Sequence, residues 1–340
     1  MTIESATASP SKKRDATSSP PSRQRWFGLA ALAIAALLPF RLGPATVFNL
    51  SQVLVFSCAV VGMVLLTGFT RQISLGQNFF FAVGGYAAAF AVIDLDISYL
   101  VVPFLSFALC YACGYLFGLP ILGIRGTYLA LVTMGMGLVT PFLVRRFEGF
   151  TGGSMGRQIE PVEPPSGLDL AADQWIYFVC LGFLVVVVTV ARRIELSQVG
   201  RAMKSVGDNE IAASLSGIDV RMAKSTAFAW SGGMAGVAGA LFVILVGFIA
   251  PGSLDLFLAI HLLTALVIGG QRSIVGAVLG AAFIVFVPLQ TQQVSESLSG
   301  SLFGVFIIAA MLLLPDGIAG GLASLRRRVA TSILRKTRKH

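Results

Sequence analysis

Residues 200–217 read GRAMKSVGDNEIAASLSG, and this polar segment separates two long apolar blocks. The block before it contains QWIYFVCLGFLVVVVTVA at residues 174–191, and apolar runs of similar length recur along the whole chain. A helix needs about 20 apolar residues to cross about 30 Å of hydrocarbon. The chain is 56% hydrophobic and only 12% charged. The sequence therefore predicts an all-α polytopic membrane protein.

Ten apolar runs can be distinguished, and they predict about ten transmembrane helices. A transmembrane β-barrel would show short segments of alternating polarity, whereas these runs do not alternate. A helix also satisfies its own backbone polar groups in lipid. The predicted spans are residues 26–40, 49–67, 76–93, 99–120, 126–146, 174–191, 226–249, 256–271, 274–290 and 300–315.

The net charge of +9 is carried mainly by three clusters of lysine and arginine, which lie before Trp26, at residues 192–224 and after Leu325. Basic clusters beside membrane spans are typical of segments on the cytoplasmic side. Membrane topology therefore explains the charge better than nucleic-acid binding does. Ten spans after a cytoplasmic N-terminus place the polar segment and the C-terminus in the cytoplasm as well.

These patterns predict three parts in the chain. Residues 1–25, which are rich in Ser, Thr, Pro and basic residues, are expected to form a disordered cytoplasmic tail. Residues 26–320 form the transmembrane domain, with a cytoplasmic loop at about 192–225 and an outer loop at about 148–173. Residues 321–340 form a basic cytoplasmic tail. The outer loop is compatible with a lid, a partner-binding surface or a plain connector.

The chemistry that the sequence lacks is also informative. There is no G-x-x-x-x-G-K-[ST] motif, so the chain is not expected to bind nucleotide phosphates in the P-loop manner. The two histidines, His261 and His340, are too few for a metal cluster or a histidine-based triad. No lysine or carboxylate falls near the middle of a predicted span, which argues against an ion-coupled carrier. We predict a protein that is not an enzyme and has no cofactor, and whose energy for uphill transport comes from another subunit.

The polar segment is either a solvated loop or a docking surface for a soluble partner. A helix is predicted at residues 209–216. Asp208 and Glu210 lie near its start, where negative charge suits the helix dipole. Gly217 suits a helix stop. Alanines at 212 and 213 would give the helix a slim face, while Arg201 and Lys204 would offer charge for partner contacts.

Glycine pairs interrupt predicted spans in both halves of the chain, at residues 84–85, 232–233 and 269–270. In transporters, glycine-interrupted segments in both halves point to the translocation site. Close helix packing explains each pair at least as well. We take residues 76–93 as a candidate part of the translocation pathway.

Several separated motifs resemble those of branched-chain amino-acid ABC importer permeases. Residues 72–77 (QISLGQ) and 84–86 (GGY) are similar to the G-Q-x-S-L-G…G-x-G-A-Y signature of that family. Residues 125–131 (RGTYLAL) resemble its R-G-x-Y-x-A segment, 151–153 its outer T-G-G motif, and 315–317 its C-terminal P-D-G. The polar segment is similar to the family's cytoplasmic loop. The similarity runs from about residue 50 to 320.

The resemblance implies a permease subunit of the branched-chain amino-acid/ribose permease type in a bacterial cytoplasmic membrane. It would work with a second permease, two ATPase subunits that use the ATP, and an extracytoplasmic solute-binding protein, and would carry an amino-acid substrate. The polar segment would contain the helix that couples to the ATPase, through Arg201, Lys204, Asp208, Asn209, Glu210, Ala212, Ala213 and Gly217. The candidate pathway residues are Gln77, Asn78, Gly84, Gly85, Thr127 and Tyr128.

This chain departs from the family pattern at several positions. Arg71 replaces the first glycine of the G-Q-x-S-L-G signature, and Asn78 stands where a small apolar residue is usual. Met155 and Ala277 replace a common acidic residue and a common proline. These departures concern the identity of the solute. The alternatives are a permease for urea or short amides in the same family, and a passive channel or facilitator.

Overall fold

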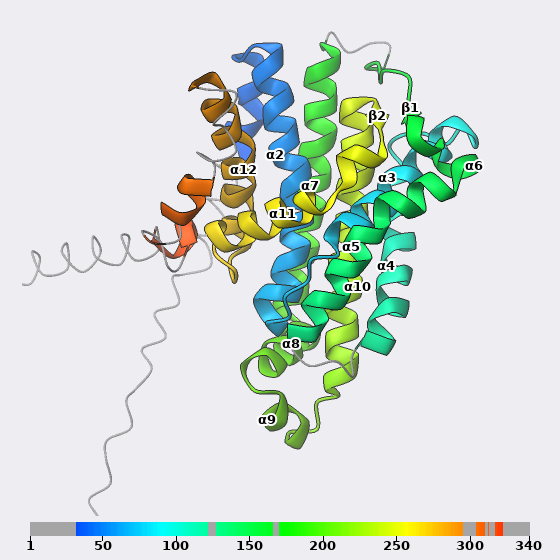
Figure 1. The fold of residues 1–340 in the computed structure, drawn as a ribbon. Coiled ribbons are helices and arrows are strands. Elements are labelled where there is room, and N and C mark those ends of the chain that lie inside the picture. The colour runs from blue at the N-terminus through cyan, green and yellow to red at the C-terminus, as the bar shows by residue number, and fades with distance from the viewer. Residues whose placement is uncertain are drawn as a thin grey trace, which may run out of the picture. The chain divides into compact units, whose positions relative to one another are not determined.

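The structure is a computed structural model that describes residues 32–121, 127–165, 170–294, 304–309, 312 and 317–321 (Figure 1). The chain divides into two compact units, Met1–Leu42 and Gly43–His340. In the first unit, residues 32–37 are helical and the 3-10 helix η1 (Leu38–Phe40) follows them. The second unit contains the other helices and strands that the structure describes.

Helices dominate the second unit. Its longer helices are α2 (Pro44–Met63), α3 (Gln77–Ile93), α4 (Val102–Ile121), α5 (Thr127–Arg146), α7 (Ala172–Leu196), α8 (Gln198–Asp208), α10 (Val220–Val246), α11 (Leu256–Gly269) and α12 (Ile274–Val294). Shorter elements are the π-helix η2 (Val64–Phe69), α6 (Glu148–Thr151), α9 (Glu210–Leu215) and the 3-10 helices η3 (Gly153–Met155) and η4 (Pro251–Leu254). A further helical stretch covers residues 304–309.

The predicted spans agree closely with these helices. Among the described residues, six helices are long and apolar enough to cross a membrane: Pro44–Phe69, Val102–Leu119, Tyr128–Arg146, Ala172–Leu196, Val220–Val246 and Ile274–Gln292. The predicted spans 76–93 and 256–271 correspond to the shorter apolar helices α3 and α11. The first and last predicted spans are described only in part, and the tail at 1–25 lies outside the described residues, as does the C-terminal tail after residue 321.

Helix α10 forms the centre of the core and contacts α2, α3 and α4. The Asp219 side chain caps its start by accepting a hydrogen bond from the Met222 amide, and Gly247, at a φ of 75°, ends it. Small residues along α10 allow close approach to its neighbours. A Cβ atom built on Gly239, for example, would lie 2.0 Å from the carbonyl oxygen of Phe81 in α3.

A two-stranded sheet ties the predicted outer loop to the end of α10. Strand β1 (Arg157–Gln158) pairs antiparallel with β2 (Phe248–Ile249), so that Arg157 lies opposite Ile249. Arg157 also forms an ion pair with Asp94, which follows α3. This end of the unit is therefore held by pairing between segments about 90 residues apart in the chain.

Candidate translocation and coupling sites

Helices α8 and α9 contain the polar segment, and side chains cap both of their starts. The Ser197 hydroxyl accepts a hydrogen bond from the Gly200 amide at the start of α8. The Asn209 side chain accepts from the amides of Ile211 and Ala212 at the start of α9. Such caps satisfy amides that a helix start leaves without partners. Short polar side chains thus divide the segment into two helices.

Helix α9 ends as the sequence predicts. Gly217 adopts a left-handed conformation with φ of 80°. Its amide donates to the Ser214 carbonyl at 3.0 Å, and the Ile218 amide donates to the Ala213 carbonyl at 3.1 Å. These two bonds form the Schellman motif, which favours glycine at this position. The predicted helix at 209–216 and its glycine stop are therefore confirmed.

The two alanines of α9 face different surroundings. Ala213 is buried in a small apolar cluster with Val206 of α8 and Ala223 of α10, whereas Ala212 is exposed. Two residues that the sequence analysis missed, Ile211 and Leu215, are 73% and 84% exposed. Residues four apart in a helix share one face, so these two form an apolar patch. An apolar i, i+4 pair inside a charged segment was the signal that could have found it.

Most charged side chains of the polar segment have partners within the chain. Lys204 pairs with Glu195 at 2.9 Å, and its ammonium lies 4.4 Å from the centre of the Phe69 ring. Glu210 pairs at 2.6 Å with Lys224, a lysine whose side chain is only 5% exposed. The Arg201 guanidinium donates to the Leu196 carbonyl. These charges position α8 and α9 on the rest of the protein, and their role toward a partner stays a prediction.

Asp208, the last residue of α8, contacts two arginines from other parts of the chain. Its Oδ1 atom accepts a hydrogen bond from Arg272 at 2.9 Å and lies 3.5 Å from the Arg71 guanidinium. The hydrogen bond from Arg272 is the main cause that holds the pKa of the Asp208 carboxyl below its ordinary value, with both positive charges adding to it. The carboxylate is therefore charged at neutral pH.

The pathway candidates Gln77 and Asn78 lie at the start of α3 and are buried. The Gln77 side-chain nitrogen donates to the Ser231 hydroxyl of α10 at 2.6 Å. The Asn78 nitrogen lies within hydrogen-bonding distance of three carbonyls, those of Gly137, Leu254 and Asp255, at 3.0–3.2 Å. The Gln77 Oε1 and Asn78 Oδ1 atoms have no hydrogen-bond partner among the described residues. Asn78 therefore joins the starts of α3 and α11 to α5.

This junction lies near the middle of α5, because Gly137 is close to the centre of that helix. Helices α3 and α11 thus both begin inside the apolar bundle, and each is preceded by non-α-helical backbone. Their 17 and 14 residues give lengths of only about 25 Å and 21 Å at about 1.5 Å per residue. Interrupted helices of this kind mark binding sites in transporters. Asp255 caps the start of α11 at this junction, where its side chain accepts a hydrogen bond from the Leu258 amide.

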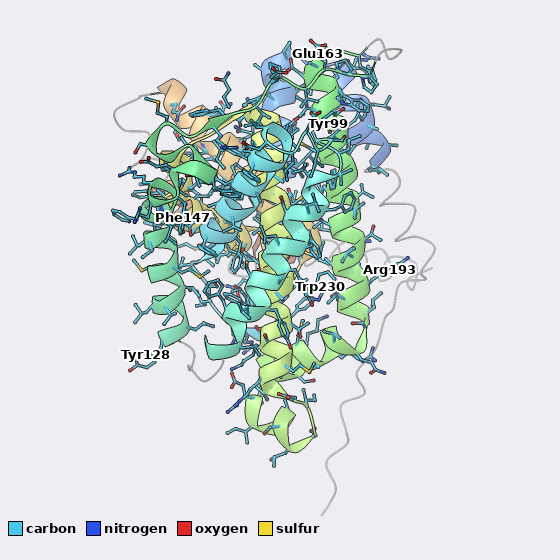
Figure 2. The ribbon with its side chains drawn as sticks, turned by 90° about the vertical axis from the view of Figure 1, so that its right-hand side faces the viewer. Tyr99, Tyr128, Phe147, Glu163, Arg193 and Trp230 are labelled. Carbon is cyan, nitrogen blue, oxygen red and sulfur yellow. The ribbon has the colours of Figure 1, made fainter. Side chains whose placement is uncertain are left out.

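The remaining pathway candidates do not join Gln77 and Asn78 in one site. Gly84 and Gly85 lie where α3 crosses α10, and a Cβ on Gly84 would come 2.3 Å from the Gly236 carbonyl oxygen. This contact favours the close-packing interpretation of the pair. Thr127 begins α5, and Tyr128 is 69% exposed. Figure 2 shows Tyr128 near one end of α5 and Phe147 just beyond the other.

An apolar cavity of about 320 Å³ lies beside α3. Side chains from α3, α4, α5 and α6 line it, among them Phe79, Leu109 and Phe150. Tyr86 also lines it, and the Tyr86 hydroxyl is buried without a hydrogen-bond partner among the described residues. The cavity size falls at the lower end of the range for small-molecule sites. No pattern in the sequence indicated it, because its lining comes from four helices.

Comparison with known proteins agrees with this architecture. Residues 45–314 match the family described as "Branched-chain amino acid transport system / permease component". LivM, the high-affinity branched-chain amino acid transport system permease protein of Escherichia coli K12, is 27% identical over 319 residues, covering 87% of this chain and 75% of LivM. The LivM of Salmonella typhimurium LT2 matches with the same identity and coverage.

A second kind of relative carries a different name. The autoinducer 2 import system permease protein LsrC of Salmonella typhi is 29% identical over 272 residues, or 75% of each chain. No solved structure matches the chain. The family match covers most of the chain, and the fold supplies apolar helices of membrane-spanning length. The chain therefore belongs to the branched-chain amino acid transport system permease family and is a multi-pass inner-membrane permease subunit of an ABC importer, not an enzyme.

Proposed function

We propose that this chain moves branched-chain or related amino acids across a bacterial cytoplasmic membrane, driven by ATP that separate ATPase subunits hydrolyse. The observation that carries this proposal is the apolar patch of Ile211 and Leu215 on α9. Both side chains are exposed in a segment that is otherwise polar, and exposed apolar groups with a polar rim are typical of protein-binding sites. An ATPase subunit that covers these two side chains would pass the movement caused by ATP hydrolysis directly to α9.

The other partners follow from the same role. We propose a second permease subunit that completes the pathway, and an extracytoplasmic binding protein that delivers the solute at the end that carries α6 and β1. Helix α5 offers a surface for a helical partner, because Leu131, Val132 and Phe142 are exposed along it. Membrane lipid or a second permease would cover these side chains. Both termini are proposed to be cytoplasmic, no bound cofactor is proposed, and nucleic acid is not a proposed partner.

The names of the relatives support amino acids as the first choice of substrate. LivM is named for branched-chain amino acids and LsrC for autoinducer 2. Urea or short amides remain the alternative within the family, and a passive channel is the alternative outside it. The apolar cavity beside α3 has room for an aliphatic side chain, since its lining is almost wholly hydrocarbon.

The test is reconstitution of the complete transporter in liposomes with its ATPase, its second permease and its binding protein. We expect uptake of radiolabelled leucine only with ATP inside the vesicles that hold the ATPase. Parallel assays with urea and autoinducer 2 separate the substrate alternatives. Leucine flux through this chain without ATPase subunits would instead establish a passive facilitator.

The patch on α9 is tested separately by a pull-down of the ATPase in detergent. Leu215→Ser should weaken association about tenfold, the loss expected when a central apolar contact of an interface is removed. The matched control is Met155→Ser, which changes another highly exposed apolar side chain in η3, near the opposite end of α10. Equal ATPase association for Leu215→Ser and the unchanged protein would remove α9 as the docking surface.

A further inference from the structure

Asp208 connects three segments that are far apart in the sequence. Arg272 lies in the turn between α11 and α12, and Arg71 directly follows the π-helix η2 and Thr70. A single oxygen, Asp208 Oδ1, is the atom that both guanidinium groups approach. We call these three residues the Asp208 bridge. It joins the end of α8 to two separate turns of the transmembrane unit.

The backbone around the bridge is also closely packed. A Cβ on Gly207, which precedes Asp208, would lie 2.0 Å from the Phe69 carbonyl oxygen. A Cβ on Gly68 would lie 2.0 Å from the Gln271 carbonyl oxygen. No side chain fits between these segments, so α8, the end of η2 and the turn at 270–273 are in direct backbone contact. Movement of one is therefore passed to the others.

Arg71 adopts a conformation that glycine favours. Its φ is 54°, in the left-handed region, where the backbone of residues other than glycine is strained. In this chain an arginine occupies the strained position and places its guanidinium beside Asp208. The arginine side chain thus supplies one of the two ion pairs to Asp208.

The two arginines adjoin the two interrupted helices, since Arg71 precedes α3 and Arg272 follows α11. From Arg71 the chain continues through the non-helical residues 72–76 into α3, and Arg272 lies just after the end of α11. The starts of α3 and α11 meet at Asn78, near the middle of α5. The bridge and the Asn78 junction therefore hold the same pair of elements at two levels. One displacement of α8 would act on both α3 and α11.

We propose that Asp208 is a positioning residue that transmits movement of the ATPase-bound α8 and α9 to α3 and α11 together. This inference rests on the proposed function for its role in transport. The side chains of Asp208, Arg71 and Arg272 are 62%, 62% and 52% exposed. Exposed ion pairs contribute little to stability. The bridge therefore sets the relative position of segments, and its loss should leave the fold intact.

The first experiment uses the purified chain alone and measures hydrogen exchange of the backbone. Asp208→Asn should increase exchange in residues 71–76 and in 270–273 together, by up to about fivefold, since the variant releases both turns and exposed ion pairs are weak. The matched control is Glu195→Gln, which breaks a 2.9 Å ion pair to the same helix, α8, but contacts neither turn. Unchanged exchange in either turn, or an equal increase in the control, would overturn the inference that Asp208 holds both turns.

The second experiment measures leucine transported per ATP hydrolysed in the reconstituted complex. Asp208→Asn should lower this ratio about tenfold, within the usual range of coupling between sites, while the ATPase still copurifies. Arg272→Gln added to Asp208→Asn should cause no further loss, because both changes remove the same link. Arg71→Gly should lower the ratio less than Asp208→Asn and should not lower the melting temperature, since it relieves backbone strain.

The outcomes separate this inference from the proposed function. Failure of the unchanged complex to take up leucine with ATP counts against the proposed function, and the exchange experiment still decides whether the bridge exists. ATP-driven uptake with a normal ratio in Asp208→Asn would overturn the positioning role. If Asp208→Asn does not assemble, Arg71→Gly and Arg272→Gln decide the question singly, and normal ratios in both would also overturn it.

Discussion

The crossing of α3 with α10 and the α8–α9 end are built in opposite ways. At the crossing, glycines bring backbones together, and the surrounding residues carry no charge. At the α8–α9 end, helices are short, side chains cap them, and ion pairs hold them in place. The apolar side chains of the crossing are buried, whereas the α8–α9 end also exposes Ile211 and Leu215. Stability therefore resides in the crossing, whereas partner binding and movement belong to α8 and α9.

The largest expected effect tests the crossing. Gly84→Leu should destabilise the protein by about 3 kcal/mol, because overpacking at a close contact forces backbones apart. The relevant contact is with the Gly236 carbonyl oxygen, only 2.3 Å from a Cβ at this position. The measurement is the free energy of unfolding in detergent micelles. Gly135→Leu is the control, since no described atom lies within 4 Å of a Cβ there. Equal losses in both would contradict the comparison.

A smaller loss is expected at the Asn78 junction. Asn78→Ala removes the donor to the Gly137, Leu254 and Asp255 carbonyls and should cost about 2 kcal/mol, the usual effect of leaving buried polar groups unpaired. Thermal unfolding of the purified variants measures it. The comparison variant is Thr140→Val, whose hydroxyl bonds only within its own helix, to Met136. A larger loss for Thr140→Val would show that the junction does not hold α3, α5 and α11 together.

The next smaller loss of stability concerns the ion pair of Glu210 and Lys224 at the α8–α9 end, where the two substitutions should differ. Glu210→Gln leaves the buried Lys224 ammonium without its partner and should cost about 1 kcal/mol, less than for a fully buried pair because Glu210 is 53% exposed. Lys224→Met should cost less, since a methionine keeps the apolar stem. Chemical denaturation of both variants gives the difference. The reverse order would mean that the lysine does not depend on this pair.

The smallest effect is the acid dependence of the Asp208 bridge. Arginine partners lower the pKa of Asp208 in the folded protein. Its stabilising contribution is therefore complete above the unfolded-state pKa of about 4 and is lost as the pH falls through the lower folded-state value. The melting temperatures of the unchanged protein and Asp208→Asn should differ slightly at pH 7 and converge in acid. A difference that grows in acid would show the opposite sign of linkage.

The sequence predicts the helices well, but it does not predict how deep within the bundle each helix begins. Hydropathy alone located the spans that became α2, α4, α5, α7, α10 and α12, and the local signals of Asn209 and Gly217 bounded α9. The segments 76–93 and 256–271 are apolar like the spanning helices, so their starts in the middle of the bundle could not be predicted. Only contacts with Gly137 and with each other reveal where α3 and α11 begin.

The site candidates divide in the same way. The polar and charged residue types identified residues 200–217 as one distinct segment. That this segment contacts an ATPase stays a prediction. The partners of its charges were not predictable, since Asp208 is 64 residues from Arg272 and Arg71 lies still further away. The i, i+4 patch of Ile211 and Leu215 was present in the sequence, but only the burial of Ala213 shows which face of α9 is free.

The sequence by itself determined that this chain is a helical membrane protein, that it has a polar segment between apolar blocks, and that it resembles one permease family. These properties depend on composition and on short-range periodicity, which each segment carries alone. Only the tertiary structure decided that α3 and α11 start face to face, that glycines pack against α10, and that Asp208 joins two distant turns. Those properties depend on which backbones approach one another, and that approach is set by packing of the whole unit.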